Sequence, residues 1–297
     1  MSTGATQTTP EAGASPPRED EFTARRQVFE PHRAGLPPVV PYVRELWRRR
    51  EFAFELSRTE LRVAHFNTVF GQAWLVINPL LLAGVYFVLV DILRSGHRPP
   101  GFFAHLVGAL FAYYFVSDAV RQSIRAVTSG GKLILNTSFP RILLPISSVI
   151  TGVKRFLPTL LVYIPVHLLS HRPVDLQLLW LIPIAALLLL LATGLATIVS
   201  AAQVYFRDLK NFLPYALRVW LYISPVLYVA HEVPDRYHVL LVVNPLASML
   251  TAWSDVLDNG ATPAAQDLLI ATIWGVGVFL VGAAFFMSRE REFAVRL

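Results

Sequence analysis

Three basic side chains, Lys154, Arg155 and Arg218, fall inside long apolar segments of this sequence. A charge within a bilayer costs about 3 kcal/mol or more unless it faces a cavity or a partner. A guanidinium that faces a cavity can bind a phosphate group through two parallel hydrogen bonds. These positions are therefore candidates for binding an anionic ligand. The alternative is that the apolar helices begin after them, so that the side chains reach back to the membrane surface.

The sequence offers no set of residues that would catalyse a reaction. The nearest match to a phosphate-binding P-loop, residues 130–133, lacks both the hydroxyl and the preceding glycine, so we expect no ATP site. There is no cysteine, and the eight histidines form no H-E-x-x-H motif, so we expect no metal site. A membrane-embedded glycosyltransferase would need acidic residues grouped at the membrane face. Here Asp91, Asp118 and Asp208 are scattered, which disfavours such an enzyme.

The composition indicates that helices in a membrane position the candidate residues. Of 297 residues, 54% are hydrophobic and 15% are charged, whereas a soluble domain carries roughly 25% charged residues. A bilayer core about 30 Å thick needs about 20 apolar residues in a helix, and helices satisfy their backbone polar groups internally. We predict an all-α integral membrane protein with six spans, at about residues 73–93, 102–120, 142–169, 176–204, 211–230 and 268–288.

The distribution of charge predicts the orientation of these spans. The net charge is +6, but the arginines flank apolar segments and do not form the basic patch of a nucleic-acid-binding protein. With the N-terminus inside, 22 of the 26 Lys and Arg residues lie on the cytoplasmic side. The positive-inside rule therefore places both termini in the cytoplasm. Arginine outnumbers lysine 23 to 3, which suggests a GC-rich bacterial genome and hence a bacterial plasma membrane.

The region before the first span has two parts. Residues 1–40 are rich in Ser, Thr, Pro, Gly and Glu and contain no apolar run, which predicts a disordered cytoplasmic tail. Residues 41–297 form the predicted transmembrane domain, which opens with an amphipathic helix over 41–70 that lies in the membrane interface, anchored by Trp47. The alternative is a soluble helix in a small N-terminal domain. The charged stripe comprises Arg44, Arg48, Glu51, Glu55, Arg58 and Arg62, and the apolar stripe Phe52, Leu56, Val63, Phe66 and Phe70.

Two connections between spans have unusual lengths or patterns. Residues 231–267 are long and partly apolar, which favours short helices that dip back into the outer leaflet. Residues 131–141, on the inner side, suit one or two helical turns ended by Pro140. A short rigid projection of this kind could receive force from a soluble motor. The alternative is an ordinary interfacial loop.

Five groups of residues, in the same order along the chain, resemble the landmarks of one family. They are Phe70-Gly71-Gln72-Ala73-Trp74 with Asn78-Pro79; Phe139-Pro140-Arg141 followed by Ile-Leu-Leu-Pro; Tyr205-Phe206-Arg207-Asp208-Leu209-Lys210; Ser224-Pro225-Val226; and Asn244-Pro245-Leu246. From about Arg44 to the C-terminus the sequence is thus similar to the ABC-2 type permeases that export polysaccharides such as O-antigen and teichoic acid.

The resemblance implies six spans after an interfacial helix, with re-entrant gate helices between the fifth and sixth. It further implies a homodimer that pairs with two copies of a separate cytoplasmic ATPase, which would bind ATP and Mg²⁺. Residues 131–141 would then be the coupling helix that docks on this ATPase. The contact residues would be Lys132, Leu133, Ile134, Leu135, Asn136, Phe139, Pro140 and Arg141.

Members of this family move a glycan carried on a polyprenyl diphosphate through a channel at the dimer interface. Aromatic faces suit sugar rings, although aromatic residues are also common at membrane surfaces. The candidate path residues in this sequence are Trp74, Tyr86, Lys154, Arg155, Tyr215, Arg218, Trp220, Tyr222 and Tyr228. We expect export of a lipid-linked polysaccharide, with a cell-wall galactan as one candidate. The alternative is an ABC-2 permease that exports a drug or a lipid.

Overall fold

The computed structural model of the chain describes residues 38–64, 70–97 and 99–296. The chain divides into two units, Met1–Gly35 and Leu36–Leu297, and the described residues all belong to the second. Nearly all of the predicted tail over 1–40 lies outside the described residues, as do residues 65–69 of the predicted amphipathic helix, including Phe66.

The described residues are helical and contain no strand, which confirms the all-α prediction. Five helices are long and apolar enough to cross a membrane, so the chain is a multi-pass membrane protein. These helices are α3 (Trp74–Leu93), α4 (Phe102–Ser123), α7 (Leu143–Leu169), α8 (Leu181–Tyr205, preceded by η3, Leu176–Trp180) and α12 (Ala265–Arg289).

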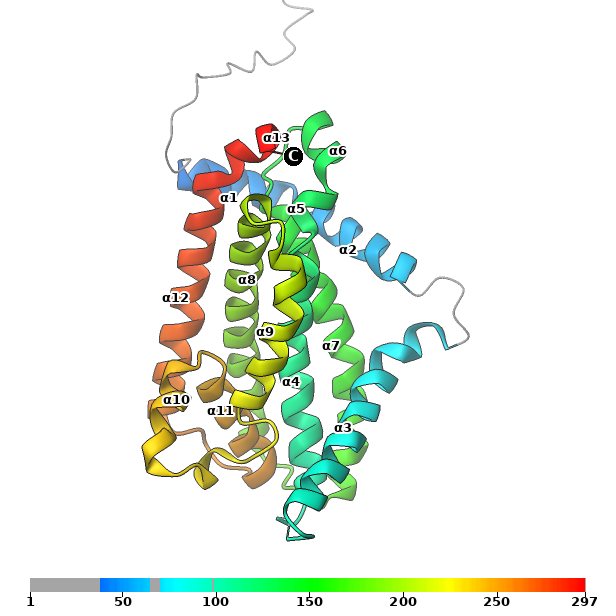
Figure 1. Ribbon diagram of the computed structural model, residues 1–297, viewed down its shortest axis with the longest axis vertical. Coiled ribbons are helices and arrows are strands. Elements are labelled where there is room, and N and C mark those ends of the chain that lie inside the picture. Colours follow the sequence, from blue (N-terminus) through cyan, green and yellow to red (C-terminus); the bar gives the residue numbers. More distant parts are fainter. Residues whose placement is uncertain (1–37, 65–69, 98, 297) are drawn as a thin grey trace, which may run out of the picture. The chain divides into compact units, whose positions relative to one another are not determined.

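The long helices pack around α4, which is the most buried of the five. Successive helices alternate in direction from α3 to α8 (Figure 1). Helices α4 and α7 run antiparallel, because Gly108 approaches Tyr163 near one end of the pair and Gly152 approaches Ala119 near the other. The glycines let the two backbones approach closely, which is how helices in lipid gain packing energy.

Helices α8 and α12 run parallel and touch through glycine. A Cβ atom added to Gly282 would lie 2.3 Å from the carbonyl oxygen of Gly194, and one added to Gly194 would lie 2.5 Å from the backbone of Val278. Such distances are shorter than any real Cβ contact. The two helices can therefore meet in this way only if both positions carry no side chain.

The fifth predicted span is shorter than the predicted range of 211–230. Helix α9 covers Leu209–Ile223, 15 residues, or about 22 Å, which is less than the hydrocarbon core of about 30 Å. The helix ends where Ser224 adopts an extended conformation before Pro225, because a residue that precedes proline is driven out of the helical region. The apolar residues that follow it are not helical.

The segment between α9 and α12 contains short helices, as predicted for re-entrant gate helices. They are η4 (Ala230–Glu232), η5 (Asp235–Tyr237), α10 (His238–Val243) and α11 (Ala247–Asn259). The α10–α11 pair is bent by 104°. In Figure 1, α9 arrives and α12 departs at the same, lower end. The segment between them therefore returns to the end at which it starts, as a re-entrant segment does.

The predicted amphipathic helix is divided into two helices, α1 (Val39–Arg48) and α2 (Arg50–Ala64). The backbone bends at Arg49, which lets α1 lie beside the C-terminal segment while α2 packs on α7. The face of α2 that is fully buried carries small residues, Ala53 and Ser57. Val63, which belongs to the predicted apolar stripe, is exposed and does not lie on this buried face.

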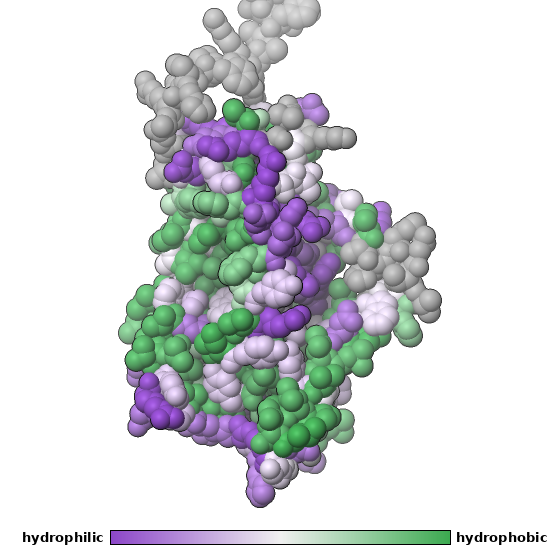
Figure 2. Space-filling view, in the orientation of Figure 1, coloured by the Kyte–Doolittle hydropathy of each residue, from purple (hydrophilic) through white to green (hydrophobic). Residues whose placement is uncertain are grey.

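The remaining short helices gather at the upper end in Figure 1. They are α5 (Ala126–Ser129), α6 (Gly131–Asn136), η6 (Glu290–Glu292) and α13 (Phe293–Arg296). One more short helix, η2 (Gly71–Ala73), directly precedes α3. Figure 2 shows hydrophobic residues over much of the middle and lower parts of the visible face, hydrophilic residues at both ends, and a strip of hydrophilic residues that extends from the upper end into the middle. This pattern is that of an apolar band bounded by two polar surfaces.

Candidate functional site

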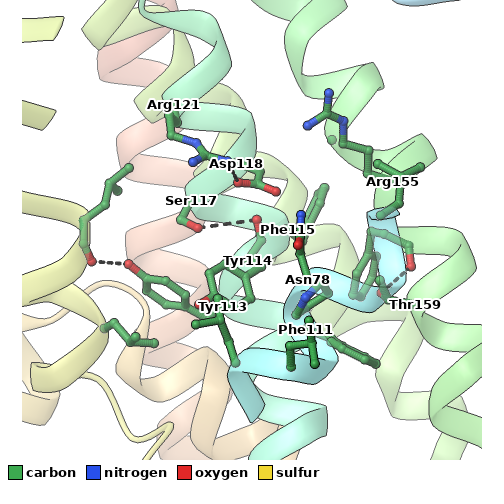
Figure 3. Close-up of a pocket in the computed structure, with 18 of the residues that line it drawn as sticks. Asn78, Phe111, Tyr113, Tyr114, Phe115, Ser117, Asp118, Arg121, Arg155 and Thr159 are labelled. Atoms are coloured by element: carbon green, nitrogen blue, oxygen red, sulfur yellow. Dashed lines mark hydrogen bonds and ion pairs between the residues drawn. The ribbon is translucent and has the colours of Figure 1, made fainter. Parts of the chain in front are cut away.

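A cavity of about 660 Å³ lies between α3, α4, α7 and α9. Figure 3 shows its side chains converging from these helices. Many of the lining residues on a helix are three or four positions apart in the sequence, which places them on one face of that helix. They are Trp74, Leu75, Asn78, Pro79, Leu81, Leu82 and Tyr86 of α3; Phe111, Tyr113, Tyr114, Phe115, Ser117, Asp118 and Arg121 of α4; Gly152, Arg155, Phe156 and Thr159 of α7; and Pro214, Leu217, Arg218 and Leu221 of α9.

The cavity carries a net positive charge. Three arginines, Arg121, Arg155 and Arg218, and one aspartate, Asp118, leave a charge of +2 on its lining. Asp118 accepts a hydrogen bond from Arg121 at 2.6 Å. Arg155 and Arg218 make no hydrogen bond or ion pair within the described part of the chain, and Nε of Arg155 is buried without a partner. Guanidinium groups with free donors in such a place favour an anionic ligand.

The lining changes in character along α4. Aromatic residues from Phe111 to Phe115 come first, and Asp118 and Arg121 follow toward the end that carries α5 and α6 (Figure 3). The ring of Phe115 stacks on that of Phe156, with 5.0 Å between centroids. The cavity therefore offers a charged end and an apolar, aromatic end. This division suits an amphiphile that has an anionic head.

Four of the nine predicted path residues line this cavity: Trp74, Tyr86, Arg155 and Arg218. Tyr222 lies beside it, with its ring centroid 6.5 Å from that of Tyr86. The cavity thus brings together the two predicted arginines and the aromatic residues of the first predicted span.

The other predicted path residues lie elsewhere. The Nε1 atom of Trp220 donates to Asn244 at 2.7 Å, and its ring packs on Tyr113. The side chain of Tyr215 is exposed on the surface of α9, and the hydroxyl of Tyr228 donates to the carbonyl of Ile223 at 2.6 Å. Lys154 faces away from the cavity, toward α2, where its Nζ donates to the carbonyl of Phe54 at 3.3 Å.

Several lining residues were not among the predicted site residues. The polar ones are Asn78, Ser117, Asp118, Arg121 and Thr159, and the aromatic ones include Phe111, Tyr113, Tyr114 and Phe115. A signal for them exists in the sequence. Phe111, Phe115, Asp118 and Arg121 recur at steps of four and three, which places them on one helical face.

A second candidate site lies where the predicted coupling segment meets both ends of the described chain. Arg49 donates to the carbonyl of Ser138 at 2.5 Å. Tyr42 of α1 donates to the carboxylate of Glu290 at 2.7 Å, and Arg141 donates to the backbone carbonyl of the same residue. Burial raises the pKa of Tyr42, with Glu290 adding to the effect, and burial lowers the pKa of Arg141. One carboxylate-bearing residue thus joins α1, the coupling segment and the C-terminal segment.

The predicted coupling residues are divided between buried and exposed positions. Ile134 and Pro140 are buried, while Leu133 and Phe139 are partly buried in a cluster formed with α1, α8, α12 and α13. The ring of Phe139 lies 5.0 Å from that of Phe52 in α2. Asn136 is exposed, and the side chains of Lys132 and Leu135 are not among those described. The buried members fix the segment to the chain.

The opposite end of the molecule contains two charged links. Arg94, just after α3, binds both carboxylate oxygens of Glu232, at 3.0 and 2.5 Å. This hydrogen bond from Arg94 is the main reason that the pKa of Glu232 is lowered. A carboxylate oxygen of Asp258, at the end of α11, lies 2.6 Å from Nδ1 of His105 in α4. The backbone carbonyl of Asp258 accepts a hydrogen bond from the guanidinium of Arg172 at 2.8 Å. Within the described ranges, no three His, Asp or Glu residues gather closely enough to hold a metal ion.

The chain matches no protein-family model over its length, but it is similar to several known proteins. It is 29% identical over 240 residues to the O-antigen export system permease protein RfbA of Klebsiella pneumoniae, a match that covers 80% of this chain and 92% of the relative. It is 28% identical over 262 residues to the protein of the same name from Myxococcus xanthus, a match that covers 86% of this chain and 99% of the relative.

A more distant similarity extends to a polysialic acid transport protein. The chain is 21% identical over 243 residues to the polysialic acid transport protein KpsM of Escherichia coli, covering 78% of this chain and 90% of the relative. All three relatives are transport proteins for polysaccharides by name. The matches cover nearly the whole length of each relative, so they include the helices that form the cavity.

Proposed function

We propose that this chain, which is an ABC-2 type permease of the polysaccharide exporter family, moves a polyprenyl-diphosphate-linked glycan from the cytoplasm across the plasma membrane. The observation that carries the proposal is the cavity, whose aromatic and apolar lining holds two arginines, Arg155 and Arg218, that make no hydrogen bond or ion pair within the described residues. A diphosphate would bind the arginines, since guanidinium groups bind phosphate through two parallel hydrogen bonds. The lipid chain and the first sugars would occupy the apolar and aromatic end.

The charge of the cavity fits this substrate better than it fits a neutral drug. A lining charge of +2 stays costly in a membrane until an anion neutralises it. A lipid-linked diphosphate brings both the compensating charge and an apolar tail. We keep the cell-wall galactan expected from the sequence as the first glycan to test.

We infer that the driving force comes from a separate ATPase that acts on the end carrying α6. At this end α6 is anchored by the buried Ile134, and Arg141, which follows α6 in the chain, is joined through Glu290 to Tyr42 of α1. A movement imposed on α6 would therefore reach α1 and the C-terminal segment together. We further infer that two copies of this chain form the permease and pair with two copies of the ATPase, with both termini in the cytoplasm.

The first test is purification of the tagged chain from native membranes in mild detergent, followed by mass spectrometry of proteins and lipids. The expected result is recovery of an ATPase that contains a P-loop, together with a polyprenyl-diphosphate glycan. Recovery of a drug or a phospholipid as the bound ligand would instead support the alternative kind of ABC-2 exporter. Recovery of no ATPase from a folded sample would contradict the proposed machine.

A second test addresses the cavity itself. We expect Arg218→Gln to weaken binding of farnesyl diphosphate by about tenfold or more, since a hydrogen bond to a charged group contributes about 1.5–3 kcal/mol. Lys154→Gln is the matched control, because it removes one positive charge from a neighbouring helix at a side chain that faces α2. Binding is measured by isothermal titration calorimetry on the full chain in phosphatidylcholine nanodiscs. An equal loss in both variants would contradict a specific role for the cavity.

A further inference from the structure

Helix α2 presents an acidic residue to the membrane-spanning part of the molecule. Ala53, Ser57 and Glu60 follow one another at steps of four and three, so they share one face of α2. Ala53 and Ser57 are fully buried, and α2 packs on α7. Glu60 continues the same face and is partly buried. A carboxylate on the packed face of an interfacial helix requires a partner, because an unpaired charge there is costly.

The partner surface is the part of α7 that also forms the cavity wall. The hydroxyl of Thr151 lies 3.0 Å from a carboxylate oxygen of Glu60 and 3.0 Å from the hydroxyl of Ser57. Arg155 stands four residues after Thr151, one helical turn further along the same face. Burial raises the pKa of Glu60, while the Thr151 hydroxyl and the Arg155 guanidinium oppose that rise.

Arg155 is near enough to Asp118 of α4 and Glu60 of α2 to be attracted by both carboxylates, while the guanidinium of Arg121 repels it. It forms no direct ion pair with either carboxylate within the described residues. Its Nε is buried without a hydrogen-bond partner. A guanidinium in this position can turn toward whichever anion approaches it more closely.

We propose that Glu60 is a positioning residue that competes with the anionic ligand of the cavity for Arg155. With the cavity empty, the attraction of Glu60 draws Arg155 toward α2. A diphosphate in the cavity draws the guanidinium away and weakens the hold of α7 on α2. Occupancy of the cavity is thereby communicated to the interfacial helix, on the side of the molecule where α1 and α6 lie. This inference rests on the proposed function, since it takes the cavity as the diphosphate site.

The test is the binding of farnesyl diphosphate to the full chain in phosphatidylcholine nanodiscs, compared among four variants. Glu60→Gln preserves size and removes the competing charge, so we expect it to tighten binding about three- to tenfold, as loss of a partly buried opposing charge would. Structural damage would weaken binding, so the sign separates the two effects. Glu55→Gln is the matched control on the same helix, because Glu55 is exposed and pairs loosely with Arg58 at 3.7 Å. It should leave the affinity unchanged.

Two further variants complete the test: the single variant Arg155→Gln, and the double variant that combines Glu60→Gln with Arg155→Gln. We expect the second substitution to add nothing when Arg155 is absent, because Glu60 acts through that residue. An unchanged or weakened affinity in Glu60→Gln, or an equal gain in the double variant, would overturn the role of Glu60 while leaving the proposed function intact. Failure of the unsubstituted chain to bind farnesyl diphosphate would overturn both.

The absence of cysteine allows a direct readout of α2. The variant Val63→Cys, at a side chain exposed on α2, can carry a fluorescent label in the otherwise cysteine-free chain. We expect farnesyl diphosphate to change its emission in the unsubstituted background and to leave it unchanged in Arg155→Gln. A change of equal size in both backgrounds would contradict communication through Arg155.

Discussion

At the scale of single residues, the glycines between α8 and α12 make a sharp prediction. A Cβ at Gly282 would lie 2.3 Å from the Gly194 carbonyl oxygen, whereas one at Gly277 would have no atom within 4 Å. We expect Gly282→Ala to destabilise the protein by about 1–3 kcal/mol, the usual cost of overpacking. Gly277→Ala, on the same helix, should be neutral or stabilising, because alanine favours helix over glycine.

The measurement for these two variants is the fraction of monodisperse protein that survives heating in detergent, followed by size-exclusion chromatography. Gly282→Ala should lose its peak several degrees earlier than the unsubstituted chain, while Gly277→Ala should not. Equal stability of the two variants would mean that α8 and α12 do not pack through glycine.

How far the site could be predicted also depends on single residues. Arg155 and Arg218 stood out because each interrupts an apolar run, and both line the cavity. Lys154 interrupts the same run but points to α2, because adjacent residues on a helix differ by about 100° in direction. Asp118 and Arg121 were missed as site residues because they lie near the end of an apolar segment, where charges usually mark only the membrane boundary.

At the scale of elements, apolar length located the helices but not every helix end. The predicted ranges 73–93 and 142–169 differ from α3 and α7 by a single residue at the start. The predicted range 211–230 was wrong at its end, because apolar residues continue past Ile223 although Pro225 stops the helix. The amphipathic stripe likewise could not indicate the bend at Arg49, which depends on contacts with segments far along the chain.

The link between α3 and the segment after α9 yields a prediction about elements. Arg94 and Glu232 form a two-point ion pair whose side chains are each 28% exposed. A double-mutant cycle with Arg94→Gln and Glu232→Gln should give a coupling of about 0.5–1 kcal/mol, the upper part of the range for accessible pairs. The control cycle on Arg58 and Glu55, which are 65% and 71% exposed and 3.7 Å apart, should give nearly zero.

The pH dependence of this link has a definite sign. Arg94 lowers the pKa of Glu232 below its unfolded value, which is about 4.3 for glutamate. The stabilisation is therefore fully present above that unfolded value and is lost as the pH falls through the lowered pKa. Repeating the cycle below the lowered pKa should abolish the coupling. A coupling that persists there would show that the two residues interact by packing and not by charge.

At the scale of the whole molecule, charge divides the chain into two unlike ends. The end with α1, α6 and α13 carries most of the basic residues and the contacts of Tyr42, Arg141 and Glu290. The other end carries the re-entrant helices and far fewer basic residues. The positive-inside rule acts on such an asymmetry. The rule therefore predicts that the end with α6 faces the cytoplasm, where the ATPase proposed above would bind.

This orientation can be tested with single cysteines in the cysteine-free chain. Asp235, in the segment between α9 and α12, has a fully exposed side chain, and Val295, in α13, is 86% exposed. We expect a membrane-impermeant maleimide to label Asp235→Cys in intact cells, and to label Val295→Cys only after the cells are permeabilised. Both sites lie in short segments at opposite ends of the molecule, so neither substitution disturbs the packed helices. Labelling of Val295→Cys in intact cells would reverse the orientation, and with it the assignment of α6 as the site at which a cytoplasmic ATPase acts.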